Sequence, residues 1–178
     1  MGGGEGGRRQ RGVPEEYTPQ DYLFPELYVD GIKGPREVEV DTARLVYRRR
    51  PEGRGVRLGL APYEQAWQLV IDPVEAKATR TALVLIPWEG YRGILLLPGD
   101  ELELIEARGT QVSHVSREGR EVRERSVLAY ILTGKGETRT LRAQTRGTVA
   151  LIAWYPGEHS DRYVYVIVKN PRWVQPEE

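Results

Sequence analysis

The chain of 178 residues has 26 basic and 26 acidic side chains, so no overall charge draws it to nucleic acid or to an anionic membrane. It contains no cysteine, which excludes disulfides, thiolate zinc sites, iron–sulfur clusters and cysteine nucleophiles. No apolar run is long enough to span a bilayer, and the glycine-rich start lacks the apolar segment of a signal peptide. We therefore expect a cytoplasmic protein that does not contact membranes.

The basic side chains are almost all arginine, since the only lysines are Lys33, Lys77, Lys135 and Lys169. Met1 is the only methionine. Few thermolabile side chains together with many ion-pair partners are typical of proteins from hot-living organisms. The composition therefore predicts a thermophilic source.

Residues 1–16 are rich in glycine and arginine and are predicted to form a flexible tail, because they have almost no apolar side chains to bury. The alternative is a basic arm that orders on a partner through Arg8, Arg9 and Arg11.

Residues 17–97 are predicted to form a β-rich region. Val38 and Val40 alternate with carboxylates, as in half-buried strands, and residues 81–87 are a continuous apolar run that indicates a buried strand. Residues 63–71 place apolar side chains on one helical face after Pro62, which favours one short helix.

Arg48, Arg49 and Arg50, followed by Arg54 and Arg57, form the densest positive cluster of the chain. A solvated loop between strands explains such a cluster without any partner. The alternative is an RNA contact, in which nearby tyrosines stack on bases.

Residues 98–170 contain a repeated pattern. A Gly-Thr pair at Gly109 precedes Gly119 by the same spacing as the Gly-Thr pair at Gly147 precedes Gly157. An overlay of the two halves places residues 127–131 on residues 165–169. The repeat predicts two interlocked units that close a flattened barrel, with a polar tail at residues 171–178.

The glycine turns, the apolar strand at residues 127–132, the turn containing Lys135 and the second Gly-Thr pair resemble the biotinyl/lipoyl carrier domain. That resemblance implies a barrel-sandwich hybrid fold. From about Tyr17 the chain is also similar to a family of uncharacterised archaeal proteins that is assigned to the same superfamily. This second resemblance implies the fold but no activity.

Lys135 occupies the position of the lysine that carries lipoate or biotin in carrier domains, as the resemblance implies. Glycines flank it on both sides, whereas biotinyl domains have methionines there and lipoyl domains an acidic residue before the lysine. Glycines also suit a tight turn that needs no cofactor. We expect no bound cofactor, with modification of Lys135 as an alternative.

No nucleophile elbow, phosphate-binding loop or dinucleotide fingerprint occurs in the chain. Ser113 precedes His114, and His159 precedes Ser160 and Asp161, but neighbours on a strand point to opposite faces. We expect His114 to be a core or interface histidine and His159 to be solvated.

The sequence therefore predicts a mainly β archaeal protein without enzymatic activity. The leading function is a protein-interaction or scaffold module that binds another protein or a second copy of itself, partly through its tryptophans, Trp67, Trp88, Trp154 and Trp173. The alternatives are a carrier domain that uses Lys135 and an RNA-binding accessory protein.

Overall fold

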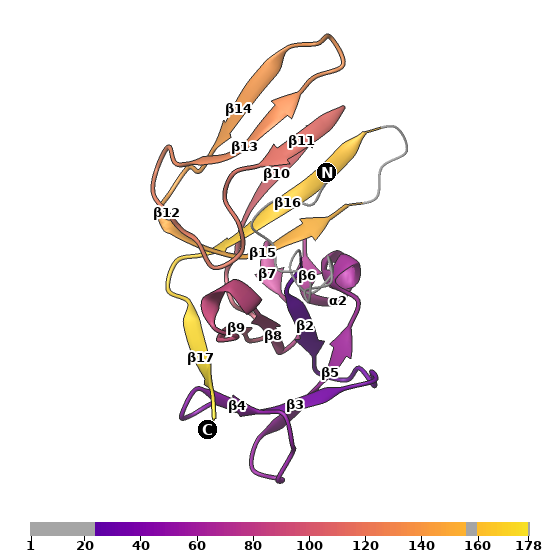
Figure 1. The fold of residues 1–178 in the computed structure, drawn as a ribbon, viewed down its shortest axis with the longest axis vertical. Coiled ribbons are helices and arrows are strands. Elements are labelled where there is room, and N and C mark those ends of the chain that lie inside the picture. Colours follow the sequence, from indigo (N-terminus) through magenta and orange to yellow (C-terminus); the bar gives the residue numbers. More distant parts are fainter. Residues whose placement is uncertain (1–23, 156–159, 178) are drawn as a thin grey trace, which may run out of the picture.

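The computed structural model describes residues 24–155 and 160–177. The predicted tail, with Arg8, Arg9 and Arg11, lies outside the described residues, as do Gly157 and His159. The described chain is mainly β and has two lobes, a closed barrel and a sandwich of two sheets (Figure 1). No described helix is long and apolar enough to cross a membrane.

Seven strands close the barrel. In spatial order they are β17 (Arg172–Pro176), β4 (Val46–Arg48), β3 (Glu37–Asp41), β5 (Val56–Ala61), β2 (Glu26–Val29), β8 (Ala82–Leu85) and β9 (Gly93–Leu96). The predicted apolar run at residues 81–87 supplies β8, which is buried along its whole length. Tyr28, Val38 and Val40 point into the barrel core.

The last strand, β17, corrects the prediction of a polar C-terminal tail at residues 171–178. It pairs antiparallel with β9 and parallel with β4, so it fills the gap that would otherwise leave the barrel open. Val174 is fully buried in the barrel core. A short polar segment was misread because its pairing partners are distant in sequence.

Glu39 corrects the prediction that the carboxylates of β3 are solvated. Its side chain is fully buried and accepts hydrogen bonds from the backbone N–H groups of Glu52, Gly53 and Arg54 at 2.8–3.0 Å. The guanidinium of Arg48, its cross-strand neighbour, donates a further bond of 2.7 Å. The loop between β4 and β5 therefore folds over the outer face of β3.

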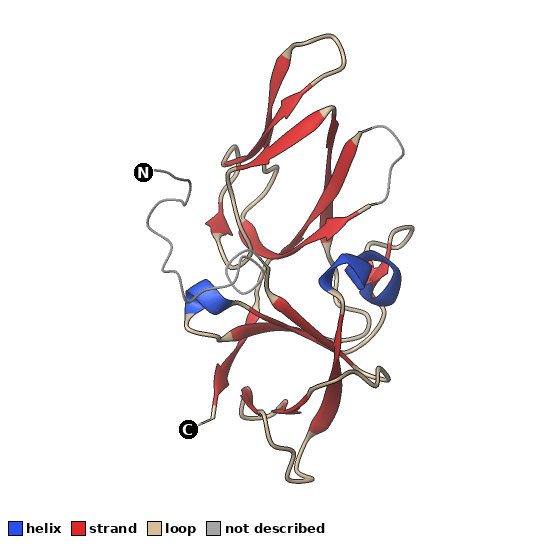
Figure 2. Ribbon diagram, turned by 45° about the vertical axis from the view of Figure 1, so that its right-hand side comes forward, coloured by secondary structure: helices blue, strands red, loops and turns tan. Residues whose placement is uncertain are grey.

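The predicted short helix is present as a 3-10 turn, η1 (Tyr63–Gln65), that continues into α2 (Ala66–Val70). A small hairpin follows, β6 (Ile71–Asp72) and β7 (Lys77–Ala78). A second 3-10 turn, η2 (Pro87–Glu89), joins β8 to β9. Figure 2 shows these helical turns on the outside of the barrel strands, where they face the second lobe.

The sandwich is inserted between β9 and β17. One sheet has the order β10 (Glu103–Gly109), β16 (Asp161–Val168), β15 (Gly147–Trp154) and β12 (Glu121–Val122). The other has the order β11 (Gln111–His114), β13 (Val127–Leu132) and β14 (Thr138–Arg142). The predicted hairpin around Lys135 joins β13 to β14 and forms the end of the molecule most distant from the barrel (Figure 1).

Gly109, at the end of β10, and Gly147, at the start of β15, lie in the same four-stranded sheet and make similar close contacts with a strand of their own half. A Cβ atom on Gly109 would lie 2.4 Å from Ile131 Cγ2 and 2.6 Å from the carbonyl oxygen of Leu132. A Cβ atom on Gly147 would lie 2.6 Å from Ile167 Cγ2 and 2.8 Å from the carbonyl oxygen of Val168. Both glycines are thus needed for a close approach to the second strand of their half.

This equivalence corrects the register of the predicted overlay. It aligns Ile131 with Ile167, whereas the sequence overlay placed Ile131 on Lys169, two residues further along. The halves are therefore related through the glycine contacts. The segment from the glycine to the isoleucine that it contacts is two residues longer in the first half than in the second.

The two lobes share one hydrophobic core. Leu27, Val84 and Ile94 of the barrel pack in the same cluster as Leu151 and Val166 of the sandwich. Two further clusters lie inside the sandwich and inside the barrel. Because apolar side chains from both lobes are buried together, separating the lobes would expose them to water.

Candidate functional site

A groove lies between the lobes, and we call it the aromatic groove. It has a volume of about 680 Å³, and its lining includes Phe24, Pro25, Pro62, Tyr63, Trp154 and Tyr163. The barrel supplies the first four of these residues, and β15 and β16 supply the other two. Its lining is therefore fixed by how the two lobes pack.

Tyr63 holds the base of the aromatic groove in place. Its hydroxyl donates to Glu118 Oε2 at 2.6 Å and accepts from the backbone N–H of Ile152 at 2.9 Å. Burial, with the neighbouring Glu118, raises the pKa of Tyr63 well above its usual value, so the hydroxyl keeps its proton and remains a donor. Both bonds join the barrel to the sandwich.

A second polar contact between the lobes involves Trp88, whose indole N–H donates to the carbonyl oxygen of Glu118 at 2.9 Å. The Glu118 side chain itself is 3% exposed. The loop between β11 and β12 is therefore tied to the barrel at two points, which makes the aromatic groove a preformed surface.

The walls of the groove carry two exposed rings. Phe24 is 51% exposed and Trp154 is 46% exposed, although both are large apolar side chains. The Phe24 ring lies 6.2 Å from the Tyr63 ring, centroid to centroid. Among the described residues, none accepts a hydrogen bond from the indole N–H of Trp154, which lines the groove.

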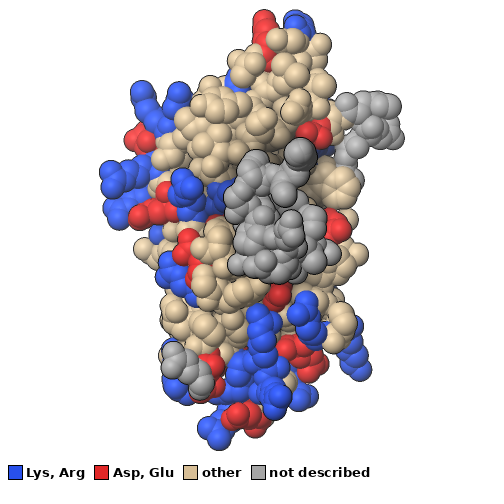
Figure 3. All heavy atoms as spheres, in the orientation of Figure 1, with Lys and Arg blue, Asp and Glu red and all other residues tan. Residues whose placement is uncertain are grey.

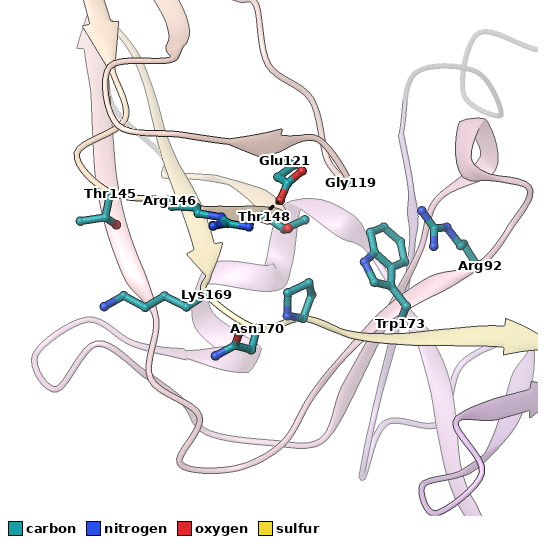
Figure 4. Close-up of a pocket in the computed structure, with 11 residues that line it drawn as sticks. Arg92, Gly119, Glu121, Thr145, Arg146, Thr148, Lys169, Asn170 and Trp173 are labelled. Carbon is teal, nitrogen blue, oxygen red and sulfur yellow. Dashed lines mark ion pairs between the residues drawn. The ribbon is translucent and has the colours of Figure 1, made fainter.

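A more polar pocket of about 790 Å³ lies on another side of the junction (Figure 4). Arg146 and Lys169 line it on one side, and Arg92 lies over the Trp173 ring on the other, 3.7 Å from the ring centroid. Arg146 is 3.8 Å from Glu121, and both side chains are mostly solvated, so that pair contributes little. The pocket is cationic, and its described lining residues include no acid–base pair positioned for proton transfer.

Lys135 lies in an exposed turn that its neighbours organise. The hydroxyl of Thr133 accepts from the N–H groups of Lys135 and Glu137, at 3.3 and 3.2 Å. Gly136 has a φ of +81°, which favours glycine, whereas Gly134 has no positive φ. The Lys135 side chain forms no ion pair with another described residue.

The three arginines at 48–50 lie in different environments. Arg48 is 8% exposed and pairs with both Glu39 and Glu177. Arg49 contacts Glu26 at 3.2 Å and lies over two tyrosine rings. Only Arg50 is exposed without an ion pair to a described residue. The segment thus offers fewer free cations than its sequence suggests.

His114 lies inside the sandwich and contacts Tyr163 edge to face, with centroids 4.6 Å apart. Its Nδ1 is 2.5 Å from the Tyr165 hydroxyl, which donates to the carbonyl oxygen of Leu128 at 2.9 Å. The hydroxyl proton is thus used, so the imidazole N–H donates to Tyr165. Burial, with help from Arg117, lowers the pKa of His114.

In the part of the chain that the structure describes, no three histidine or acidic side chains are grouped to bind a metal ion. Ser113 and His114 are neighbours on β11, with Ser113 exposed on the outer face. They do not form a nucleophile–base pair.

A family model described as "Uncharacterized protein conserved in archaea (DUF2118)" matches residues 22–170. The chain belongs to this family. The predicted archaeal membership is thereby confirmed, and the match covers the first six barrel strands and the whole sandwich. No match was found among curated proteins.

For this archaeal family member, the sequence pointed to tryptophans at an interface but did not single out Trp154. Trp67 packs on Tyr155 at 5.0 Å and Trp173 is covered by Arg92. Phe24, which shares the groove with Trp154, carries no local signal. Exposure of each residue depends on strand pairing between distant parts of the chain, which a local pattern does not encode.

Proposed function

We propose that this archaeal protein is a non-enzymatic interaction module whose aromatic groove binds an extended, proline-containing segment of another protein. The observation that carries the proposal is the exposed Trp154, whose indole N–H has no acceptor among the described residues, opposite the exposed Phe24. Large exposed rings in a preformed groove are characteristic of binding surfaces.

The chemistry of the groove favours a polyproline II segment. Such a helix has no internal hydrogen bonds, so its carbonyl groups need donors such as the indole N–H of Trp154. Its proline rings pack against aromatic side chains, which is how several peptide-binding domains recognise it. The groove is lined by aromatic and proline side chains, with Arg36 and Glu64 at its polar positions.

The test uses synthetic proline-rich peptides of about ten residues, roughly three turns of this helix, in calorimetric titrations. We expect saturable binding to the full chain that Trp154→Ala removes. Tyr130→Ala is the matched control, because it deletes an equally exposed ring (45% against 46%) elsewhere on the sandwich.

Absence of binding by any peptide, or equal binding by Trp154→Ala, would overturn the proposal. A second copy of the chain is the other candidate occupant. If analytical ultracentrifugation finds a dimer that Trp154→Ala dissociates, the groove is a self-association surface and the peptide proposal is wrong.

A carrier domain with Lys135 as its attachment site is the second candidate. The equivalent contacts of Gly109 and Gly147 support two interlocked halves, and we infer a barrel-sandwich hybrid of the biotinyl/lipoyl type from them. The Thr133-organised turn presents Lys135 at the end of the molecule. A separate ligase would use ATP to convert the carboxyl group of lipoate or biotin into an acyl-adenylate, and the Lys135 amine would displace AMP to form the amide.

Mass spectrometry of the protein purified from its native cells tests this candidate. A carrier shows an adduct of lipoyl or biotinyl mass that Lys135→Arg removes. An unmodified mass from cells that contain both cofactors contradicts it, and leaves the groove proposal untouched.

A further inference from the structure

The sheet formed by β11, β13 and β14 has a solvent face with one exposed aromatic ring at its centre. Tyr130 is 45% exposed and lies directly between Ser113 on β11 and Thr140 on β14. The next row of the same face holds Gln111, Leu132 and Thr138. The face therefore carries several hydroxyl groups, and its one aromatic ring is on the middle strand.

No described residue bonds to or stacks on this ring. Tyr130 makes no hydrogen bond, ring stack or cation–π contact with another described residue. Other tyrosines differ from it in this respect: Tyr47 donates to a backbone carbonyl, and Tyr155 lies beneath Arg162. Tyr130 thus offers a π-face to a ligand.

A local positive patch surrounds this face. Residues 120–146 contain seven basic side chains and three carboxylates, although the whole chain is neutral. The basic residues are Arg120, Arg123, Arg125, Lys135, Arg139, Arg142 and Arg146. Figure 3 shows Lys and Arg side chains along the edge of the molecule that carries β12, and a separate group at the barrel end.

Most of these cations form no ion pair with another described residue. Within residues 120–146 of the described chain the one ion pair joins Arg146 to Glu121, at 3.8 Å. Arg142 donates to the carbonyl oxygen of Arg125 and keeps its charge exposed. Arg139 is exposed on β14, the open edge of its sheet, but it pairs with the buried Ile131 and so lies on the face opposite to Tyr130. Arg142 on β14 and Lys135 in the preceding turn therefore border the face that carries Tyr130.

We propose that this sheet face binds single-stranded nucleic acid. An unpaired base stacks on Tyr130, and the phosphates on either side contact Arg142 and Lys135. Base stacking on an aromatic ring next to a basic border is sequence-tolerant, because every base has a π-face. A duplex is disfavoured because its bases are already stacked and paired.

The hydroxyl groups of Ser113, Thr138 and Thr140 on the same face can bond the 2′-hydroxyl groups of RNA. Stacking and phosphate contacts are common to RNA and single-stranded DNA. Comparing the two ligands separates these contributions, since tighter binding of RNA assigns a role to the hydroxyl-rich rows.

The experiment measures fluorescence anisotropy of labelled oligo(U), oligo(dT) and a duplex, each of about 12 nucleotides, a length within the usual site sizes. We expect saturable binding of the single strands by the full chain. Between about 50 and 200 mM salt, two phosphate contacts give a log–log slope of about −1.4.

Variants locate the site. Tyr130→Ala should weaken binding about 5- to 100-fold, the range for one stacked base, while Tyr130→Phe should retain it. Lys135→Ala with Arg142→Ala should bring the slope close to zero, since both phosphate contacts are lost. All of these side chains are exposed on the surface, and thermal melts check that the variants remain folded.

The matched control is Arg50→Ala with Arg54→Ala, which removes the same charge from the barrel end and should leave affinity and slope unchanged. The proposal is overturned if the duplex binds as tightly as the single strands, if Tyr130→Ala binds as the wild type does, or if the control pair abolishes binding. Trp154→Ala should not alter nucleic-acid binding, so this result and that for the aromatic groove are independent.

Discussion

The hydroxyl group of Tyr63 donates to Glu118 at 2.6 Å and thereby joins the barrel to the sandwich. The same oxygen accepts from the N–H of Ile152 at 2.9 Å. The Tyr63 oxygen thus bonds to one donor, the Ile152 N–H, and one acceptor, the Glu118 carboxylate, of the sandwich. The Glu118 side chain is only 3% exposed. Together with the shared hydrophobic core, this contact holds the lobes together at the aromatic groove.

Tyr63→Phe keeps the ring and removes these two hydrogen bonds. We expect the free energy of unfolding to fall by about 1–3 kcal/mol, because a buried N–H and a buried carboxyl group each lose a partner. Urea-induced unfolding followed by circular dichroism measures the change. Tyr130→Phe is the control, since its hydroxyl has no described partner, and it should stay at wild-type stability.

The peptide-binding proposal predicts a second effect of Tyr63→Phe. A loosened groove should bind proline-rich peptides more weakly even at temperatures where the variant is fully folded. Wild-type stability of Tyr63→Phe would show that the Glu118 and Ile152 contacts do not hold the lobes.

The two Gly-Thr pairs give a prediction about the repeat. Gly109→Ala and Gly147→Ala each place a methyl group within 2.8 Å of a backbone carbonyl oxygen, that of Leu132 or Val168, and strand pairing restrains both of these residues. Each substitution should destabilise the protein by about 1–3 kcal/mol, the range for overpacked sites. Similar losses in the two variants are expected from their equivalent contacts.

Gly134→Ala is the control for both variants. Its nearest neighbour would be Thr110 Oγ1 at 4.0 Å, and its backbone has no positive φ. Equal stability of Gly109→Ala and the wild type would contradict the close approach. Unequal losses at Gly109 and Gly147 would mean that one half adapts more readily than the other.

The sequence predicted the parts of the fold that depend on local pattern. An apolar run predicts β8, and residues 127–132 match β13 because a buried strand followed by a glycine turn leaves few alternatives. The helix after Pro62 was likewise predicted from its periodicity. Closure of the barrel was not predicted, because β17 is stabilised by β4 and β9, which are distant in sequence.

The same distinction applies to the candidate sites. Arg48 and Arg49 were grouped with Arg50 because they are adjacent, yet the burial of Glu39 draws Arg48 inward. Tyr130 was read only as part of an apolar strand, and its exposure follows from which face of β13 meets the core. The excess of positive charge at residues 120–146 was present in the sequence, and a windowed charge count would have found it.

Val174 tests whether β17 completes the barrel. Its side chain is fully buried, so Val174→Ala should lower the free energy of unfolding by about 2 kcal/mol. Val74→Ala is a chemically identical change at a side chain that is 87% exposed, and it should cost less than about 0.5 kcal/mol. Equal unfolding curves for the two variants would mean that residues 172–176 behave as a tail.

Glu39 predicts how stability depends on pH. The N–H of Glu52 is the largest of the contacts that lower its pKa, from 4.5 to about 2, and they outweigh the opposing effect of burial. Because the folded pKa lies below the unfolded value, the stabilisation is complete above about pH 4.5 and is lost as the pH falls towards 2. The wild type should therefore lose stability steadily across that window.

Glu39→Gln should be less stable than the wild type at neutral pH, because Arg48 would lose a buried partner. Its free energy of unfolding should also fall less steeply on acidification, since one carboxyl group with a lowered pKa is gone. Glu177, which has a lowered pKa through its bond to Arg48, keeps part of the slope. Urea unfolding at several pH values between about 6 and 2 measures both effects.

Glu37→Gln is the matched control, because Glu37 is exposed on the same strand. This substitution should leave the pH dependence of stability as in the wild type. If Glu39→Gln and Glu37→Gln give superimposable profiles, the buried carboxyl group does not hold the loop that covers β3. A shallower profile for Glu39→Gln alone assigns the acid sensitivity of the barrel to this one side chain. It would also explain why a charged residue occupies a fully buried position of β3, where an apolar side chain would leave three backbone N–H groups without acceptors.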